Sequence, residues 1–313
     1  MMPTLLVATW SDGLFTVIGE TAHQELAGRS IRGLAPDGQG AAIAIVDRRS
    51  LCRRTPDGKW HTLANSWVDL SCCVAAKGII YVGTDDARVL RMAAGGELEP
   101  LPGFDGTPGR EKWYAGTVLI DGRQLGPPLG IRSMSAACNG AVLFANVHVG
   151  GIPRSIDGGV TWQSTIDIDT DVHEVCSHAT RPNIVIAAAG VGLCISRDGG
   201  STWVVERQGL HATHCSAAAF VGDDMLVSAA TDQFAAQGAI YRRSLDRDGP
   251  LLPVGGGFPR WSDGVIDTGN IAVHDLTVAA ADGAGNLYWS EDCARTWSCR
   301  SVNLPYPSGL FIY

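Results

Sequence analysis

The sequence predicts an all-β protein assembled from small repeated sheets, and three observations support this fold class. The pattern S-x-D-x-G-x-T-W occurs at residues 155–162, 196–203 and, with Ala294 in place of the glycine, 290–297. The serines of successive copies are 41 (196 − 155) and 94 (290 − 196) residues apart, which corresponds to one and two units of roughly 40–50 residues. Short apolar segments separated by turn residues fill each unit. Units of this size are typical of the blades of a β-propeller.

The repeated pattern, which we call the repeat turn, has the chemistry of a tight turn between two strands. The aspartate carboxylate can accept backbone N–H groups, and glycine adopts the positive φ that other residues resist. Threonine and tryptophan then begin the returning strand. We expect the tryptophan to pack between neighbouring sheets.

The repeat turn resembles the Asp-boxes, also called BNR repeats, of sialidases, related glycosidases, sortilin-type receptors and photosystem assembly factors. The resemblance implies a β-propeller in which each box joins the third and fourth strands of a blade, on the face away from the active site. It therefore predicts the fold and says little about function.

Strand patterns extend over the whole chain, which we expect to form a single domain, residues 1–313. The clearest blade has predicted strands at 172–177, 184–189, 192–196 and 203–207. The first blade has strands at 4–9 and 13–18 but lacks an innermost one, and the apolar C-terminal segment 308–313 can supply it. The sequence thus predicts a seven-bladed β-propeller of four-stranded blades, closed by the C-terminal strand joining the N-terminal blade. Residues 103–131 break the rhythm and predict an irregular insert, either a lid or an edge decoration.

Composition limits the classes of partner and the compartment. The formal net charge is −8 and no basic run occurs, so we expect neither a nucleic-acid nor a membrane partner. The nine cysteines are odd in number and include no CxxC, which argues against a disulfide framework and a zinc knuckle. The N-terminal residues do not resemble a secretory signal, and we expect a cytoplasmic location.

One face of a propeller gathers the starts of its innermost strands, and aligning the blades predicts which side chains meet there. Counting back 11 residues from each second strand, or shifting by the repeat spacing, gives a charged or imidazole side chain in six blades. These are His173 (184 − 11), His214 (225 − 11), Asp69 (80 − 11), Arg32 (43 − 11), Arg132 (173 − 41) and Asp267 (173 + 94). Loops on the same face add Trp10, His148, Asp232, Gln233 and Trp261. Such a ring either binds a ligand or only solvates the mouth of the channel.

Three histidines from successive blades, His148, His173 and His214, suggest a metal site. Three neutral imidazoles suffice to bind zinc, iron or copper with one position open for substrate. Asp232 or Asp267 could complete the shell or fix a ring tautomer. The alternative is that each imidazole bonds a backbone carbonyl.

The arginines suggest an anionic ligand, such as a sugar acid or another small molecule. Arg32 and Arg132 offer forked donors that match a carboxylate or a phosphate, and they could lie on either side of Asp69. Arg–Asp pairing across the ring is the structural alternative. We assign possible catalytic roles to Asp69, Asp267 and Arg132, and ligand binding to Arg32, Trp10, Trp261, Asp232 and Gln233.

Three functions remain open at this point. The first is an enzyme or binding protein that holds a small anionic molecule, with a possible His-bound metal and a hydrolase or lyase reaction. The second is a divergent sialidase-like glycoside hydrolase, although the R-I-P motif and the Tyr–Glu pair of sialidases have no counterpart: residues 151–154 read G-I-P-R. The third is a non-catalytic scaffold that binds a protein. An exposed apolar patch around Trp113 and Tyr114 would favour this function.

Overall fold

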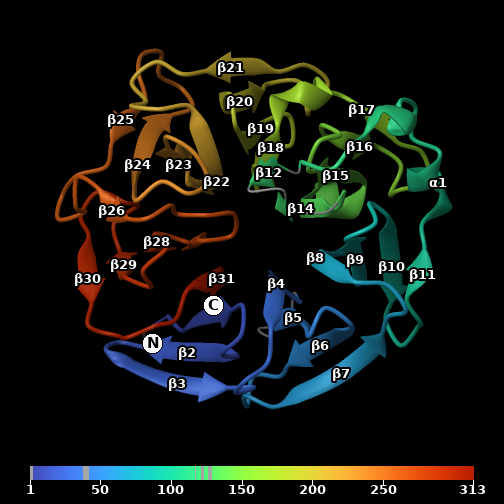
Figure 1. Cartoon of the computed structure of the whole chain (residues 1–313), viewed down its shortest axis with the longest axis horizontal. Coiled ribbons are helices and arrows are strands. Elements are labelled where there is room, and N and C mark those ends of the chain that lie inside the picture. Colours follow the sequence, from blue (N-terminus) through green and yellow to red (C-terminus); the bar gives the residue numbers. More distant parts are fainter. Residues whose placement is uncertain (1–2, 38–41, 117, 121–122, 126–128) are drawn as a thin grey trace. The chain divides into compact units, whose positions relative to one another are not determined.

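The computed structural model describes residues 3–37, 42–116, 118–120, 123–125 and 129–313, and in them the chain forms the seven blades of a β-propeller (Figure 1). Each blade is a four-stranded sheet, and the sixth carries one strand more. Blade 1 contains β31 (Pro307–Ile312), β1 (Leu5–Thr9), β2 (Leu14–Ile18) and β3 (Thr21–Glu25). Blade 2 contains β4 (Ile31–Pro36), β5 (Ala42–Val46), β6 (Ser50–Arg54) and β7 (Trp60–Asn65). Blade 3 contains β8 (Leu70–Ala76), β9 (Ile79–Thr84), β10 (Val89–Ala93) and β11 (Glu99–Pro100).

The remaining four blades follow in chain order. Blade 4 contains β14 (Ile131–Ala137), β15 (Val142–Val147), β16 (Pro153–Ser155) and β17 (Gln163–Ser164). Blade 5 contains β18 (Val172–Ser177), β19 (Val185–Ala189), β20 (Gly192–Ser196) and β21 (Val204–Glu206). Blade 6 contains β22 (His214–Val221), β23 (Asp224–Ala230), β24 (Gln237–Ser244), β25 (Leu252–Pro253) and the extra β26 (Ser262–Asp263). Blade 7 contains β27 (Ile271–His274), β28 (Thr277–Ala281), β29 (Leu287–Ser290) and β30 (Ser298–Arg300).

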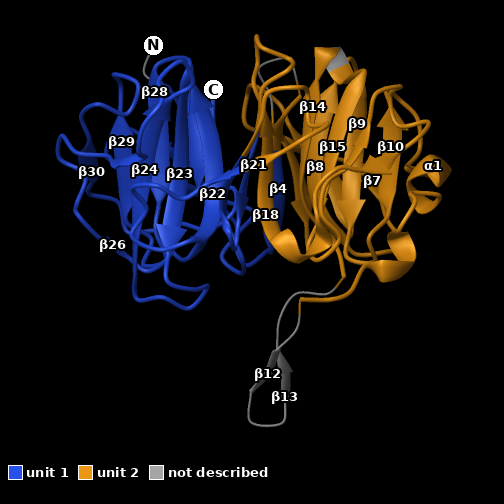
Figure 2. Cartoon of the chain, turned by 90° about the horizontal axis from the view of Figure 1, so that it is seen from above, with its two compact units in different colours: residues 1–34, 186–194, 205–313 blue, residues 35–185, 195–204 orange. Residues whose placement is uncertain are grey.

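The chain divides into two compact units, which Figure 2 colours separately. Unit 1 comprises residues 1–34, 186–194 and 205–313, and unit 2 comprises residues 35–185 and 195–204. Blades 1, 6 and 7 belong to unit 1, and blades 3 and 4 belong to unit 2. Blade 2 lies in unit 2 apart from the start of β4, while blade 5 contributes strands to both units.

Each unit has its own apolar core, built where two of its blades face each other. In unit 1, buried side chains of blades 6 and 7 form one cluster, and those of blades 7 and 1 form another. In unit 2, blades 2 and 3 share one cluster, and blades 3 and 4 share a second. The tryptophans of two repeat turns, Trp162 and Trp297, belong to these clusters, as the sequence predicts. Burying each large apolar side chain stabilises the fold by about 1.5–3 kcal/mol.

The C-terminal strand completes the N-terminal blade and confirms the predicted closure of the ring. Strand β31 runs antiparallel to β1, with Leu5 opposite Ile312 and Val7 opposite Leu310. Leu310 and Ile312 are buried in the cluster shared by blades 7 and 1. Strand β31 is therefore the innermost strand of blade 1, and both edges of β1 are paired, one with β2 and the other with β31.

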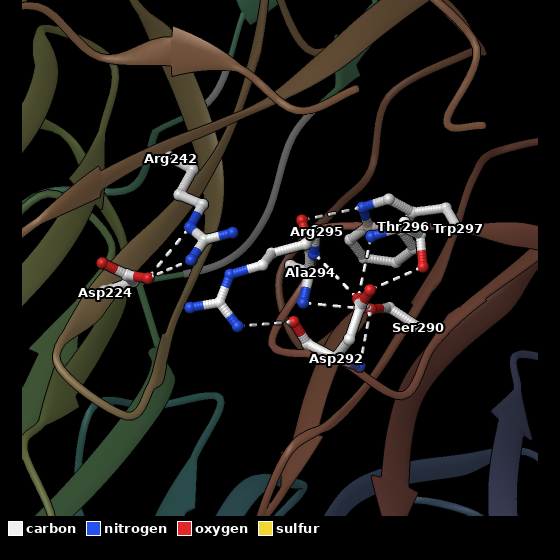
Figure 3. Close-up of polar contacts among 8 residues, drawn as sticks. All are labelled: Asp224, Arg242, Ser290, Asp292, Ala294, Arg295, Thr296 and Trp297. Carbon is white, nitrogen blue, oxygen red and sulfur yellow. Dashed lines mark hydrogen bonds and ion pairs between the residues drawn. The ribbon is translucent and has the colours of Figure 1, made fainter. Parts of the chain in front are cut away.

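All three repeat turns lie between the third and fourth strands of their blades and share the hydrogen bonds of their serine, aspartate and threonine, whereas the indole of Trp203 donates to the hydroxyl of Thr165 instead of to its own turn. In the copy of blade 7 (Figure 3), the Asp292 carboxylate accepts hydrogen bonds from the backbone of Arg295 and from both the backbone and the hydroxyl of Thr296. The Ser290 hydroxyl accepts the N–H of Ala294, and the indole N–H of Trp297 donates to the carbonyl of Ala294. The serine, aspartate and threonine are thus needed to hold the turn.

Blade 6 lacks the repeat turn and uses arginines in its place. Arg242 on β24 forms an ion pair with Asp224 on β23, which Figure 3 also shows. Its neighbour Arg243 donates to the carbonyl of Gly249 at 2.7 Å and pairs with Glu206 at 3.2 Å. Charged side chains therefore brace this turn, which follows β24.

Protonation of the repeat-turn aspartates is expected to lower the free energy of unfolding. Hydrogen bonds from the Thr202 hydroxyl and backbone lower the pKa of Asp198 from its ordinary value of 3.8 to about 2. Because the folded pKa is the lower one, the stabilisation is present above about pH 4 and is lost as the pH falls toward 2. We expect Asp198→Asn to unfold at a lower urea concentration than the wild type at pH 6, and the two midpoints to converge toward pH 2. Glu97→Gln on the surface is the control, and a difference that does not change with pH would contradict this role of the charge.

The insert has more structure than the irregular segment that the sequence predicts. It contains α1 (Pro102–Asp105), the 3-10 helix η1 (Arg110–Lys112) and a hairpin of β12 (Val118–Ile120) and β13 (Arg123–Leu125). Two further 3-10 helices, η2 (Cys138–Gly140) and η3 (Ile168–Thr170), lie outside it. Among the described residues, no helix combines the length and the apolar character that a membrane span requires.

Candidate metal centre

Two buried imidazoles and one carboxylate meet in unit 2. His148 directly follows β15, and His173 is the second residue of β18. Asp171 follows η3 in the left-handed region, with a φ of 51°, and leads into β18. The Asp171 carboxylate lies next to both imidazoles, whose rings stack with centroids 6.3 Å apart.

The distances within this group suit a metal ion. The Nε2 atom of His148 lies 3.6 Å from Oδ1 of Asp171, and the Nε2 atom of His173 lies 3.4 Å from Oδ2. Ligands bound at about 2.0–2.1 Å to a tetrahedral zinc ion lie about 3.3–3.4 Å from one another. One ligand atom from each of the three residues lies within 4.8 Å of the others, and within the described residues no other group of three His, Cys, Asp or Glu side chains does so.

Burial and charge give these groups the protonation states that metal binding requires. Burial, and then the positive charge of Arg132, lower the pKa of His148 to about 4, so its imidazole is neutral near pH 7. Burial alone would raise the pKa of Asp171, but its interactions with His173, and then with His148 and Arg132, lower it to about 2. A neutral imidazole and an ionised carboxylate are therefore available at neutral pH.

Part of the polar surface of this group has no partner in the protein. His148 is 6% exposed, and neither its Nδ1 atom nor Oδ1 of Asp171 has a hydrogen-bond partner within the described residues. A buried polar atom without a partner costs about 1–3 kcal/mol. A ligand on Asp171 would offset part of that cost.

A short strap from the insert, residues 113–116, crosses both loops that carry the ligands. Trp113 anchors it in the core against Phe104, with ring centroids 5.7 Å apart. The backbone N–H of Tyr114 donates to the carbonyl of Val149, next to His148. The hydroxyl of Tyr114 donates to Asp169 at 3.1 Å, two residues before Asp171. The strap therefore links the two loops.

Gly116 of the strap lies against the His148 ring, and replacing it by alanine is expected to displace the imidazole. A Cβ at position 116 would lie 1.9 Å from Cε1 and 2.2 Å from Nδ1 of His148. We expect Gly116→Ala to lower the free energy of unfolding by about 1–3 kcal/mol, measured by urea denaturation. The control is Gly255→Ala, since a Cβ at position 255 meets no atom within 4 Å. Equal stabilities of the two variants would contradict the close packing of the strap.

The structure places most of the aligned residues at the starts of innermost strands, as the alignment predicts. Arg32, Arg132 and His173 are the second residues of β4, β14 and β18, and His214 is the first residue of β22. Asp69 directly precedes β8, whereas Asp267 lies four residues before β27. His214 belongs to unit 1 and is not a member of the His148–Asp171–His173 group.

Other predicted site residues have local partners. Asp69 forms ion pairs with Arg48 and Arg49. Asp267 accepts the N–H of Thr268 at 2.7 Å. These contacts suit structural roles for both carboxylates.

The predicted ligand-binding residues of unit 1 lie in three places. Arg32 stacks over the ring of Trp10, with its guanidinium carbon 4.7 Å from the ring centroid. Asp232 accepts the N–H of Phe234, and both Asp232 and Gln233 are exposed. Trp261 directly precedes β26 and packs on His211.

Sequence reasoning did not find Asp171 or the strap. Asp171 has no strand-pattern signal, because its backbone is left-handed rather than extended. The strap has no local signal either, since its contacts with the two loops that carry the ligands join residues more than 30 positions apart in the sequence.

Comparison with known proteins supports the fold. No protein-family model matches the chain, and no curated protein matches its sequence. An ancestral GH74 enzyme has a TM-score of 0.61 at 14% identity, over 99% of this chain and 40% of that chain. The GH74 xyloglucanase from Xanthomonas campestris has a TM-score of 0.60 at 16% identity, over 95% of this chain and 46% of that chain. YCF48 bound to D1 peptide has a TM-score of 0.56 at 16% identity, over 87% of this chain and 82% of that chain.

These likenesses show a shared β-propeller fold and no more, because the identities are low. The chain spans less than half the length of the two GH74 enzymes.

Proposed function

We propose that this protein binds a divalent transition metal through His148, Asp171 and His173, and that it uses the site to hold a small anionic molecule. The observation that carries the proposal is the meeting of two buried imidazoles and one ionised carboxylate at ligand distances. Three protein ligands leave a coordination position open, which is typical of catalytic rather than structural metal sites.

The donor set favours zinc or iron(II). Two imidazoles and one carboxylate occur in zinc hydrolases and in non-haem iron(II) enzymes, while copper electron-transfer sites add a cysteine. The described group contains no cysteine. A bound zinc ion would lower the pKa of a coordinated water and so provide a nucleophile near neutral pH.

Arg132 would bind the small anionic molecule of the proposed function. It lies on β14, and its charge acts on both His148 and Asp171. A guanidinium beside an open metal position can bind a carboxylate or phosphate group with two parallel hydrogen bonds. The anionic ligand would then contact the metal on one side and Arg132 on the other.

The experiment is a zinc titration by calorimetry of the metal-free protein, followed by a titration of the zinc-loaded protein with inorganic phosphate. We expect one zinc per chain, and phosphate binding that Arg132→Gln weakens about tenfold or more without loss of zinc. Arg91→Gln, an exposed arginine of β10, is the control. No zinc binding would end the proposal, and unchanged phosphate affinity in Arg132→Gln would remove the role of Arg132.

A glycoside hydrolase is the second candidate, favoured by the likeness to GH74 folds and by the Asp-box resemblance. Such an enzyme needs two carboxylates that flank the scissile bond. Asp69 is held between two arginines, which does not suit a general acid. Turnover of aryl glycosides or sialosides that is lost in Asp69→Asn or Asp267→Asn would favour this candidate over the metal site.

A protein-binding scaffold, suggested by the likeness to YCF48, has less support. The apolar patch expected around Trp113 is not on the surface, because Trp113 is only 7% exposed and packs in the core. Tyr114 is half-exposed but bonded to Asp169.

A further inference from the structure

In unit 1, a buried tyrosine holds the imidazole of His211 in one orientation. Tyr241 lies on β24 and is 4% exposed. Its hydroxyl oxygen accepts the backbone N–H of His211 at 3.1 Å and lies 2.7 Å from Nδ1 of the same residue. Nδ1 is the only acceptor recorded for this hydroxyl among the described residues. When this hydroxyl donates to Nδ1, the neutral imidazole carries its proton on Nε2, which makes Nε2 a donor.

A tryptophan and an arginine complete a cluster around His211. The ring of Trp261 lies edge-on to that of His211, with centroids 4.7 Å apart. The guanidinium carbon of Arg260 stacks 5.2 Å from the centroid of Trp261. Strand β26, which begins at the next residue, pairs with β24, the strand that carries Tyr241 (Figure 1).

The cation of this cluster is exposed and has no anionic partner. Arg260 is exposed, and within the described residues no carboxylate lies within ion-pair distance of it. His211 is exposed as well, while Trp261 is half-buried. An unpaired arginine fixed on an indole is notable in a chain of net charge −8.

We propose that Arg260, Trp261 and His211 form a second binding site, for a small organic carboxylate carried on a ring. The guanidinium fork matches a carboxylate, and the Nε2–H of His211 can donate to the same group. The indole offers apolar surface to the ring that carries it. The site offers one cation, Arg260, and one neutral donor, His211. This combination matches the single negative charge of a sugar acid or an aromatic acid better than the double charge of a phosphate.

This site is separate from the proposed metal centre. It shares no residue with His148, Asp171 and His173, and it belongs to unit 1 rather than unit 2. The two proposals can therefore fail independently.

The test is an NMR titration of the ¹⁵N-labelled indole groups with sodium benzoate, sodium glucuronate and glucose as separate probes. The Trp261 signal is assigned from its loss in Trp261→Phe. We expect a saturable shift with at least one of the two carboxylates and none with glucose, and the carboxylate that binds identifies an aromatic or a sugar ligand. Arg260→Gln should weaken binding about tenfold or more.

The control is Arg295→Gln, which removes an exposed arginine of the repeat turn in the same unit and should leave binding unchanged. Tyr241→Phe removes the hydroxyl that fixes His211 and should weaken binding about threefold or more without changing the charge. The absence of any shift, an equal shift with glucose, or unchanged affinity in Arg260→Gln would overturn the proposal. Unchanged affinity in Tyr241→Phe would overturn the part assigned to His211.

Discussion

Removal of residues 309–313 is expected to abolish folding or to lower the melting temperature severely. The deletion takes Leu310 and Ile312 out of the core shared by blades 7 and 1, and it leaves β1 with an open edge. Truncating a large buried side chain costs about 2–5 kcal/mol, and a whole domain is stable by only about 5–15 kcal/mol. Circular dichroism melts and light scattering measure the two consequences, unfolding and association through the open edge.

A milder variant keeps this prediction testable if the deletion gives no folded protein. Leu310→Ala combined with Ile312→Ala retains the strand and should still lower the free energy of unfolding by about 4 kcal/mol or more. The control is Ile18→Ala on β2 of the same blade, because Ile18 is exposed. A double variant as stable as this control would contradict a structural role for the closing strand.

Asp171→Asn is expected to lower zinc affinity at least about 100-fold, because it removes the only charged ligand of the proposed site. This exceeds the 10–100-fold loss typical of changing a residue in the outer shell of a metal. His173→Gln should have a comparable effect, since it removes a buried imidazole. Competition with a chromophoric chelator measures the affinities.

The neighbouring carboxylate provides a matched control for this prediction. Asp169→Asn changes a residue of the same loop, two positions away, that bonds Tyr114 and is not a member of the ligand group. We expect it to retain zinc binding within about threefold. Equal losses in Asp169→Asn and Asp171→Asn would indicate a general effect of loop charge and contradict direct ligation.

The local chemistry of the chain made much of the fold predictable. The serine, aspartate and threonine of each repeat turn bond one another and the backbone between them, as Ser290, Asp292 and Thr296 do, so the turn has a local sequence signal. The closing strand was predictable for a different reason: the first blade lacks an inner strand and an apolar segment is left at the C-terminus. The spacing of the repeats and the residue composition of the segments were sufficient to predict both features.

The candidate site was only partly predictable, because it depends on contacts between distant residues. The alignment placed His173 and Arg132 at the starts of inner strands, where the structure has them. Asp171 was missed because its position follows from the left-handed turn that ends η3, which the strand pattern does not report. The burial of Trp113 depends on packing against Phe104 and could not be read from a segment without strand pattern.

An anomalous difference map, recorded at the zinc edge from crystals of the zinc-loaded protein, tests the central claim most directly. The claim predicts a single strong peak in unit 2, about 2.0–2.2 Å from Nε2 of His148, Nε2 of His173 and a carboxylate oxygen of Asp171. A map without density between these three side chains, while they keep the geometry described above, would contradict it.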